Sequence, residues 1–265
     1  MPIASAGRIT VQTETRDGGL VATVVIDRPD RLNAMGAALF DSFAEAVRRL
    51  SADPALRAIV VAGAGERAFV GGADIGEMSG ISAPETARAF ILKVHEACAS
   101  LRACPAPVIA RIQGYCFGAG LELAAACDFR IAGSDAQFGM PEVRLGIPSV
   151  VEAALLPRLI GWGRARRLLL TGETIGAGTA LGWALVEEAA APGELDASVE
   201  RALADILACG PEAVRSQKRL IAAWERLPLE AAIEAGVEAF AQSFMTDEPQ
   251  RMMAAFLAAR AARKA

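Results

Sequence analysis

Residues 114–129 read GYCFGAGLELAAACDF, a stretch of small and apolar residues with one carboxylate, Glu122, near its middle. If the stretch forms a buried helix, an unpaired carboxylate costs the folded state on the order of several kcal/mol or takes up a proton. Glu122 is therefore either paired or used in chemistry. The sequence on both sides of the stretch is needed to decide between the two.

The composition of the chain narrows the class of protein. Its 265 residues are 53% hydrophobic, which suffices for one large core with a smaller appended part. The net charge is −4 and the basic residues are scattered, which argues against a nucleic-acid partner. No apolar run reaches the length of a membrane span, and the N-terminus has no apolar signal core. We therefore expect a cytoplasmic protein with no membrane partner.

The sequence has few residues that could bind a metal ion or form a histidine-activated nucleophile. The five cysteines show no metal-type pairing, and their odd number argues against a disulfide framework. His95 is the only histidine, and we interpret it as an ordinary, partly buried residue of a helix over 83–103. Cys116 has no histidine near it in sequence, so a thiolate nucleophile is not expected. We expect no metal site.

Alternating strand and helix patterns predict an α/β fold with largely parallel strands. The first two strands form a hairpin that turns at Asp17-Gly18-Gly19, and Asn33 is the predicted N-cap of a helix that runs to about Leu50. The strands are predicted at 9–15, 21–27, 57–62, 107–112 and 129–132.

The character of the sequence changes near residue 195, after which only helical patterns remain. They are predicted at 197–208, 211–223, 229–246 and 249–262. We therefore place an α/β core at 1–195 and a helical extension at 196–265.

Two kinds of glycine-rich segment must be distinguished. VVAGAGERA (60–68) contains the dinucleotide pattern G-x-G-x-x-A after a strand, but Gly71-Gly72 interrupts the helix that a nucleotide site requires. GGAD (71–74) and GAG (118–120) each precede a plausible helix start, where free backbone N–H groups can hold an anion. Alone, each is more often only a tight turn, and Glu142 alone would be read as a surface glutamate. Two such turns that converge on one oxygen would form an oxyanion hole.

From Arg28 almost to the C-terminus, the chain resembles the enoyl-CoA hydratase/isomerase (crotonase) superfamily. Four blocks are similar to successive motifs of that family: RPDRLNAM (28–35), RAFVGGADIGEM (67–78), GYCFGAGLELAAACDFRIAGSDAQFGMPEVRLGIP (114–148) and LLLTGETIGAGTALGWALV (168–186). The resemblance implies a spiral of ββα units and a C-terminal helical region that forms a homotrimer or homohexamer. It also implies an acyl-CoA thioester as substrate, so that coenzyme A is part of the substrate and no separate cofactor is expected.

The resemblance implies a set of site residues as well. The thioester oxygen is expected between the backbone N–H groups of Ala73 and Ala119, each worth about 3 kcal/mol in the transition state. Glu122 and Glu142 match the two glutamates of the hydratases, where one activates water and the other protonates C2; on that pattern Glu122 is the base and Glu142 the acid. The other implied substrate-binding positions are Asn33, Ala34, Gly72, Asp74, Ile75 and Gly118.

Retention of both carboxylates favours an enoyl-CoA hydratase, a lyase of fatty acid metabolism. Isomerases of the superfamily typically keep only the carboxylate that matches Glu142. An isomerase, a hydrolase, a decarboxylase and a non-catalytic acyl-CoA-binding protein remain the alternatives. The sequence departs from the family at SVVE (149–152) and at Gly76, where a lysine is common. Glu152 is either a third carboxylate near the site or a residue that meets a helix dipole.

Overall fold

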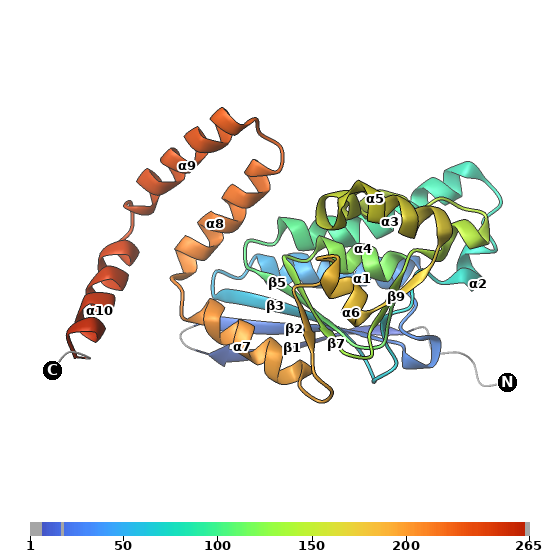
Figure 1. The fold of residues 1–265 in the computed structure, drawn as a ribbon, viewed down its shortest axis with the longest axis horizontal. Coiled ribbons are helices and arrows are strands. Elements are labelled where there is room, and N and C mark those ends of the chain that lie inside the picture. Colours follow the sequence, from blue (N-terminus) through green and yellow to red (C-terminus); the bar gives the residue numbers. More distant parts are fainter. Residues whose placement is uncertain (1–6, 17–18, 263–265) are drawn as a thin grey trace.

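The computed structural model describes residues 7–16 and 19–262, and its larger sheet is largely parallel (Figure 1). Within the described residues this sheet has the strand order β1-β2-β3-β5-β7-β10, and only β1 and β2 pair in antiparallel fashion. Its strands are β1 (Arg8–Arg16), β2 (Gly19–Asp27), β3 (Leu56–Gly63), β5 (Val108–Ile112), β7 (Phe129–Gly133) and β10 (Glu188–Ala190). Arg16 pairs with Gly19, while the other two residues of the predicted turn, Asp17 and Gly18, lie outside the described residues.

Strand β3 shows why the sheet is covered on both faces. All of its residues are buried, and successive side chains of a strand point to opposite faces. Ile59 and Val61 belong to the large core on one face, whereas Ala58 and Val60 belong to a smaller cluster on the other. A strand whose apolar side chains are buried on both faces of the sheet therefore requires helices on both sides.

A second, smaller sheet lies against the first and carries the segments that precede the glycine-rich turns. Its strands are β4 (Ala68–Val70), β6 (Tyr115–Phe117), β8 (Gln137–Gly139) and β9 (Thr174–Gly176). Strands β4, β6 and β8 run parallel, so β4 and β6 end side by side, and each is followed by a turn and a helix. The two turns thereby come from neighbouring strand ends.

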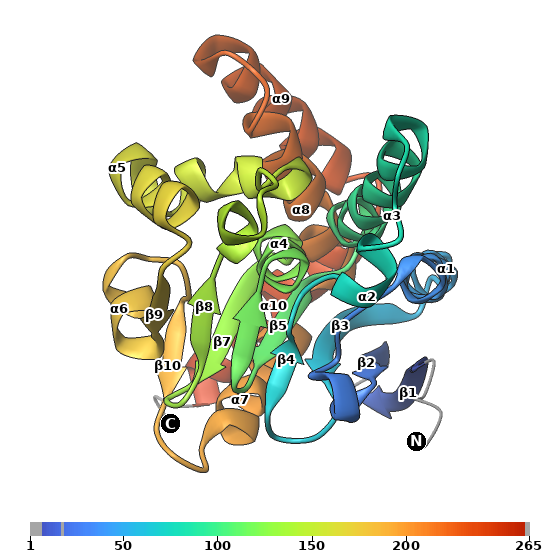
Figure 2. The same cartoon turned by 90° about the vertical axis from the view of Figure 1, so that its right-hand side faces the viewer.

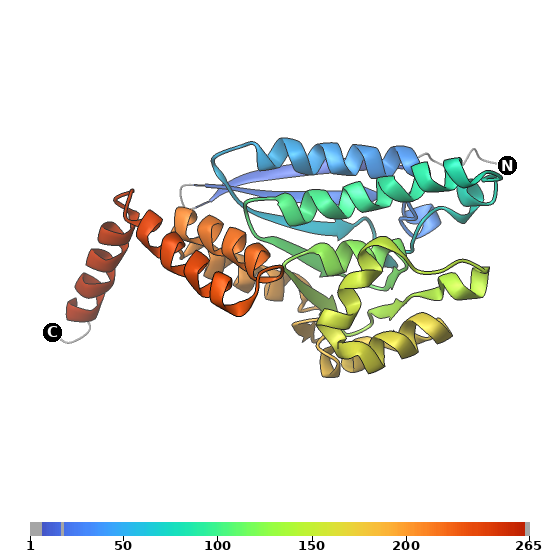
Figure 3. The same cartoon turned by 90° about the horizontal axis from the view of Figure 1, so that it is seen from above.

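The helices form layers around the sheets. They are α1 (Ala37–Ser51), α2 (Ile75–Met78), α3 (Pro84–Ala103), α4 (Ala119–Ala126), α5 (Leu156–Thr171), α6 (Ala177–Gly182), α7 (Leu195–Leu207), α8 (Pro211–Trp224), α9 (Leu229–Ser243) and α10 (Glu248–Ala262), with the short 3₁₀ helices η1 (Pro29–Arg31), η2 (Pro141–Leu145) and η3 (Val151–Leu155). Figure 2 shows α1, α3 and α4 on one side of the larger sheet and α7 on the other. Seen from above, α1 and α3 run side by side (Figure 3).

The C-terminal helices divide into two groups. Helix α7 packs on β3, β5 and β7 through Leu195, Val199 and Leu203, which follow one another at four-residue spacing. Helices α8, α9 and α10 instead lead away from the sheets, and α8 packs against α9 (Figure 1). No helix within residues 7–16 and 19–262 is long and apolar enough to cross a bilayer.

One local prediction is wrong. Asn33 is not the N-cap of the first long helix, because α1 begins at Ala37 after Gly36, and both Asn33 and Leu32 have positive φ angles. The N–H of Ala37 instead donates to both carboxylate oxygens of Glu77, at 3.1 and 3.2 Å. The cap comes from a side chain forty residues later, which local sequence does not indicate. The dinucleotide pattern leads from β3 into β4, so the helix that a nucleotide site of this kind requires does not follow it.

Candidate active site

Both glutamates and both glycine-rich turns line one cavity of about 260 Å³. Its lining includes Ala73, Ala119, Glu122 and Glu142 together with apolar side chains. The apolar lining residues on α3 are Phe90, Ile91 and Val94, and those outside α3 include Met78, Leu145, Ile147 and Val150. Phe90 and Val94 are one helical turn apart, a spacing that marks a helix face but does not reveal that the face lines a pocket rather than a core.

The two turns lie against each other, and glycine makes this possible. Gly118 has a φ of +53°, and a Cβ there would lie 2.4 Å from Oε1 of Glu142 and 4.0 Å from the Cα of Gly72. Gly72 has a φ of +120°, and a Cβ there would come within 3.3 Å of the Phe117 carbonyl oxygen. These conformations favour glycine, and the close approach leaves no room for a side chain between the turns.

Regular backbone structure sets the direction in which the N–H groups of Ala73 and Ala119 point. Ala119 is the first residue of α4, and the first N–H groups of a helix have no intrahelical acceptor. Ala73 forms a parallel bridge with Met35, in which Met35 N–H donates to Gly72 O and Asp74 N–H to Met35 O. The N–H groups of adjacent extended residues point in opposite directions, so that of Ala73 points away from Met35 and toward the pocket that it lines.

Glu122 is buried on α4, with only 4% of its surface exposed. The backbone N–H of Ala153 donates to its Oε1 at 3.2 Å. Burial, followed by the negative charge of Glu142, raises the pKa of Glu122 from 4.5 to about 8, and the Ala153 hydrogen bond opposes this rise. At neutral pH Glu122 therefore holds a proton.

Glu142 lies in the first turn of η2, directly opposite the Gly118 turn. The hydroxyl of Ser149 donates to its Oε2 at 2.7 Å. Ser149 belongs to the segment that departs from the family pattern, so the departure brings a hydrogen-bond donor to this carboxylate. The sequence did not indicate this contact, because the hairpin-like return of 146–149 toward η2 depends on Gly146 in the left-handed conformation.

The remaining predicted site residues divide into two groups. Gly72, Gly118 and Ile75 line the cavity, and Ile75 is 57% exposed beside it. Asn33, by contrast, is fully buried, where its side chain accepts from Arg28 N–H and donates to the carbonyls of Ala64 and Ala68. Its side chain fastens the preceding loop, and any contact of this segment with substrate stays a prediction.

Ala34 and Asp74 are linked through a single side chain. The Arg28 guanidinium donates to the Ala34 carbonyl at 3.0 Å and forms an ion pair with Asp74. Asp74 is also the N-cap of α2, where it accepts from Glu77 N–H. Although burial opposes it, this hydrogen bonding, mainly with Arg28, lowers the pKa of Asp74. Asp74 therefore fixes the turn that carries Ala73.

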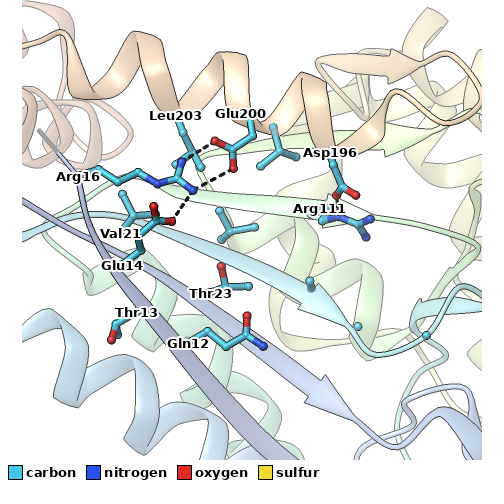
Figure 4. Close-up of a pocket in the computed structure, with 15 residues that line it drawn as sticks. Gln12, Thr13, Glu14, Arg16, Val21, Thr23, Arg111, Asp196, Glu200 and Leu203 are labelled. Atoms are coloured by element: carbon cyan, nitrogen blue, oxygen red, sulfur yellow. Dashed lines mark hydrogen bonds and ion pairs between the residues drawn. The ribbon is translucent and has the colours of Figure 1, made fainter.

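A second cavity, of about 570 Å³, lies on the other face of the larger sheet, beside α7 (Figure 4). Its charged side chains pair with one another: Arg16 contacts Glu14 and Glu200, and Arg111 contacts Asp196. Figure 4 shows Arg16 and Glu200 pointing toward each other across this cavity. Because these charges are already paired, the cavity with Glu122 is the better candidate for chemistry.

Comparison with known proteins agrees with this geometry. The model of the family enoyl-CoA hydratase/isomerase matches residues 16–263. The chain is 37% identical to a crotonyl-CoA hydratase of Syntrophomonas wolfei, with 91% of this chain and 93% of the relative covered. It is 35% identical to a short-chain-enoyl-CoA hydratase of Clostridium acetobutylicum, over 90% and 92% of the two chains. Among solved structures, an enoyl-CoA hydratase from Bacillus anthracis matches with a TM-score of 0.88 and 30% identity, over 94% and 95% of the chains.

Proposed function

The chain belongs to the enoyl-CoA hydratase/isomerase family, and we propose that it adds water across the C2–C3 double bond of an enoyl-CoA thioester. One observation carries this proposal: two carboxylates, Glu122 and Glu142, line the same cavity as the two glycine-rich turns. Addition of water needs one group that takes a proton and another that gives one. A pair of glutamates does both without a metal or a histidine.

The chemistry follows from the positions of these groups. Glu122 takes a proton from water as the water oxygen bonds to C3. The electrons of the double bond move onto the thioester oxygen, where the N–H groups of Ala73 and Ala119 stabilise the enolate. Glu142 then gives its proton to C2, so the pair carries one proton before and after the reaction. These roles follow the family pattern and constitute our assignment.

The proton that Glu122 holds at neutral pH is the one that dehydration, the reverse reaction, requires. The negative charge of Glu142 and burial keep Glu122 protonated at neutral pH. In dehydration, Glu122 gives its proton to the departing hydroxyl group while Glu142 removes the proton from C2. Hydration starts from the other arrangement, with the proton on Glu142. We therefore expect a bell-shaped pH dependence, because losing the shared proton or adding a second one stops the reaction.

The test is a panel of purified enoyl-CoA thioesters, beginning with crotonyl-CoA, in which loss of the conjugated-thioester absorbance is followed. The names of the two relatives support starting with short acyl chains. We expect hydration by the wild type and a loss of ~10²-fold or more in Glu122→Gln. Glu96→Gln is the control, because Glu96 is 55% exposed and pairs with Arg48 on the surface. An enzyme that moves the double bond and retains full activity in Glu122→Gln would be an isomerase instead.

We propose that the protein forms a homotrimer or homohexamer. We also propose that it acts in the cytoplasm and in fatty acid metabolism. Large apolar side chains on α9 and α10 support an assembly: Val237, Phe240 and Phe256 are 68%, 70% and 67% exposed. Apolar faces of this size usually contact another chain. Sedimentation of the purified protein measures the number of copies.

A further inference from the structure

A third carboxylate, Glu152, lies next in the chain to the residue that contacts Glu122. Glu152 is on η3 and only 7% exposed. Its Oε1 is 2.9 Å from Nδ1 of His95, while its Oε2 is buried without a hydrogen-bond partner in the described part of the chain. The neighbouring residue, Ala153, donates its N–H to Glu122 at 3.2 Å. One short helix thus connects His95 to Glu122.

His95 reaches this buried carboxylate from the surface. It lies on α3, and half of its side chain is exposed, compared with 8% of the Glu152 side chain. Helix η3 packs against α3, α4 and α5. The titratable groups that face Glu152 are His95 and Cys98 from α3 and Glu122 from α4, with Glu142 beyond Glu122; in the described part of α5 no charged side chain bonds to it. Burial, and then the charge of Glu152, raises the pKa of the Cys98 thiol, so Cys98 is a neutral neighbour.

The backbone next to Glu152 is strained. Val151 has a φ of +38°, in the left-handed region that β-branched residues rarely adopt. Such a conformation persists only where its surroundings hold it in place. Here Ala153 N–H donates to Val150 O at 2.9 Å and Glu152 is fastened to His95. Release of either contact would allow η3 to relax away from Glu122.

We propose that the His95–Glu152 pair is a positioning element for Glu122, which fastens η3 so that Ala153 N–H stays on Glu122, and that the Glu152 carboxylate also acts on Glu122 electrostatically. Its effect on catalysis rests on the proposed hydratase function. A buried carboxylate opposes the ionisation of a second one nearby. The negative charge of Glu152 helps to raise the pKa of Glu122, after burial and the charge of Glu142.

The first test is the pH profile of kcat/KM for Glu152→Gln. The amide retains the shape of the side chain and a hydrogen bond to His95 but removes the charge. We expect the basic limb of the profile, where Glu122 loses the shared proton, to shift to lower pH by about half to one pH unit. The matched control, Glu96→Gln, removes a surface carboxylate from the same helix as His95 and should leave the profile unchanged. A basic limb that stays in place in folded Glu152→Gln overturns the electrostatic part of the proposal.

The second test separates positioning from a general structural role. His95→Ala removes the anchor of η3, and we expect kcat to fall about tenfold with little change in KM, because the acyl-CoA contacts are elsewhere. His95→Gln retains a side-chain donor for Glu152 and should recover most of kcat. Unchanged kcat in His95→Ala, or no recovery in folded His95→Gln, overturns the positioning part.

A third measurement does not depend on catalysis. The stability gained by Glu122→Gln should depend on pH, and it should level off at a lower pH when Glu152→Gln is also present. This holds even if no enoyl-CoA is hydrated, so failure of the proposed function and failure of this inference are distinguishable. A pH dependence that is identical in both backgrounds contradicts the inference.

Discussion

Replacement of Glu122 by glutamine should stabilise the protein, and increasingly so as the pH rises. The folded state raises the pKa of Glu122 from 4.5 to about 8, so between these pH values the folded state binds a proton that the unfolded state has released. The contribution of protonated Glu122 to the stability of the folded state is fully present below pH 4.5 and is lost as the pH rises through about 8. Stability of the wild type should therefore fall over this range relative to Glu122→Gln, which cannot ionise.

The size of the effect follows from the same pKa values. Each pKa unit corresponds to about 1.4 kcal/mol. The difference in free energy of unfolding between Glu122→Gln and the wild type should therefore grow by about 1.4 kcal/mol per pH unit between about pH 5 and pH 7.5. The total approaches about 5 kcal/mol above pH 8. The glutamine oxygen can still accept from Ala153 N–H, and any change in packing adds a constant offset that leaves the slope unaffected.

Urea-induced unfolding of both proteins at about pH 5.5, 6.5, 7.5 and 8.5 measures this slope. The protein concentration must be the same throughout, because assembly changes apparent stability. Glu96→Gln, which removes an exposed carboxylate, should run parallel to the wild type. A difference between Glu122→Gln and wild type that is constant across the pH range would refute the raised pKa and with it the shared proton of the carboxylate pair.

Three further predictions concern turnover. Gly118→Ala places a Cβ 2.4 Å from Glu142 Oε1 at a φ of +53°, so Glu142 must move; kcat should fall ~10²-fold with circular dichroism unchanged, and a near-normal kcat would contradict the geometry. Ala119→Pro removes one proposed oxyanion donor at the first position of α4, where proline fits the backbone; turnover should fall ~10²-fold or more, and normal turnover in a folded variant would remove Ala119 from the oxyanion hole. Glu142→Gln should suppress hydration and exchange of the C2 proton with deuterium together, whereas Glu122→Gln should abolish hydration and affect exchange at C2 of a saturated acyl-CoA less; equal loss of exchange in both variants would argue against separate roles.

Long elements with clear periodicity could be predicted from the sequence. All five predicted strands are present in the larger sheet, and each predicted helix after residue 195 begins and ends within three residues of the observed one. Strands of three residues, such as β4 and β9, were not predicted, because so short a segment has no periodicity and forms only when neighbouring strands supply its hydrogen bonds. Helix α7 was grouped with the later helices, although its apolar face packs on the sheet.

The parts of the candidate site that lie within local sequence motifs could be predicted from the sequence. The glycine turns and both glutamates were identified from their motifs, and the structure brings them to one cavity. The contact of Ser149 with Glu142 and of His95 with Glu152 could not be read from the sequence, because each joins segments that only the folded chain brings together. The sequence left two interpretations of Glu152, a third carboxylate near the site or a residue that meets a helix dipole. The structure supports the first.

The turn that carries Ala73 is tied to the rest of the chain at three points. Met35 bridges Ala73 itself, Arg28 holds Asp74, and Glu77 binds the start of α1. A donor held in this way loses its conformational freedom once, when the chain folds, rather than at every catalytic cycle. The amide hydrogens of the turn that bond within the protein, those of Gly71 and Asp74, should accordingly be slow to exchange with solvent deuterium in the absence of substrate, whereas that of Ala73, which faces the pocket, should be slowed when an acyl-CoA fills it.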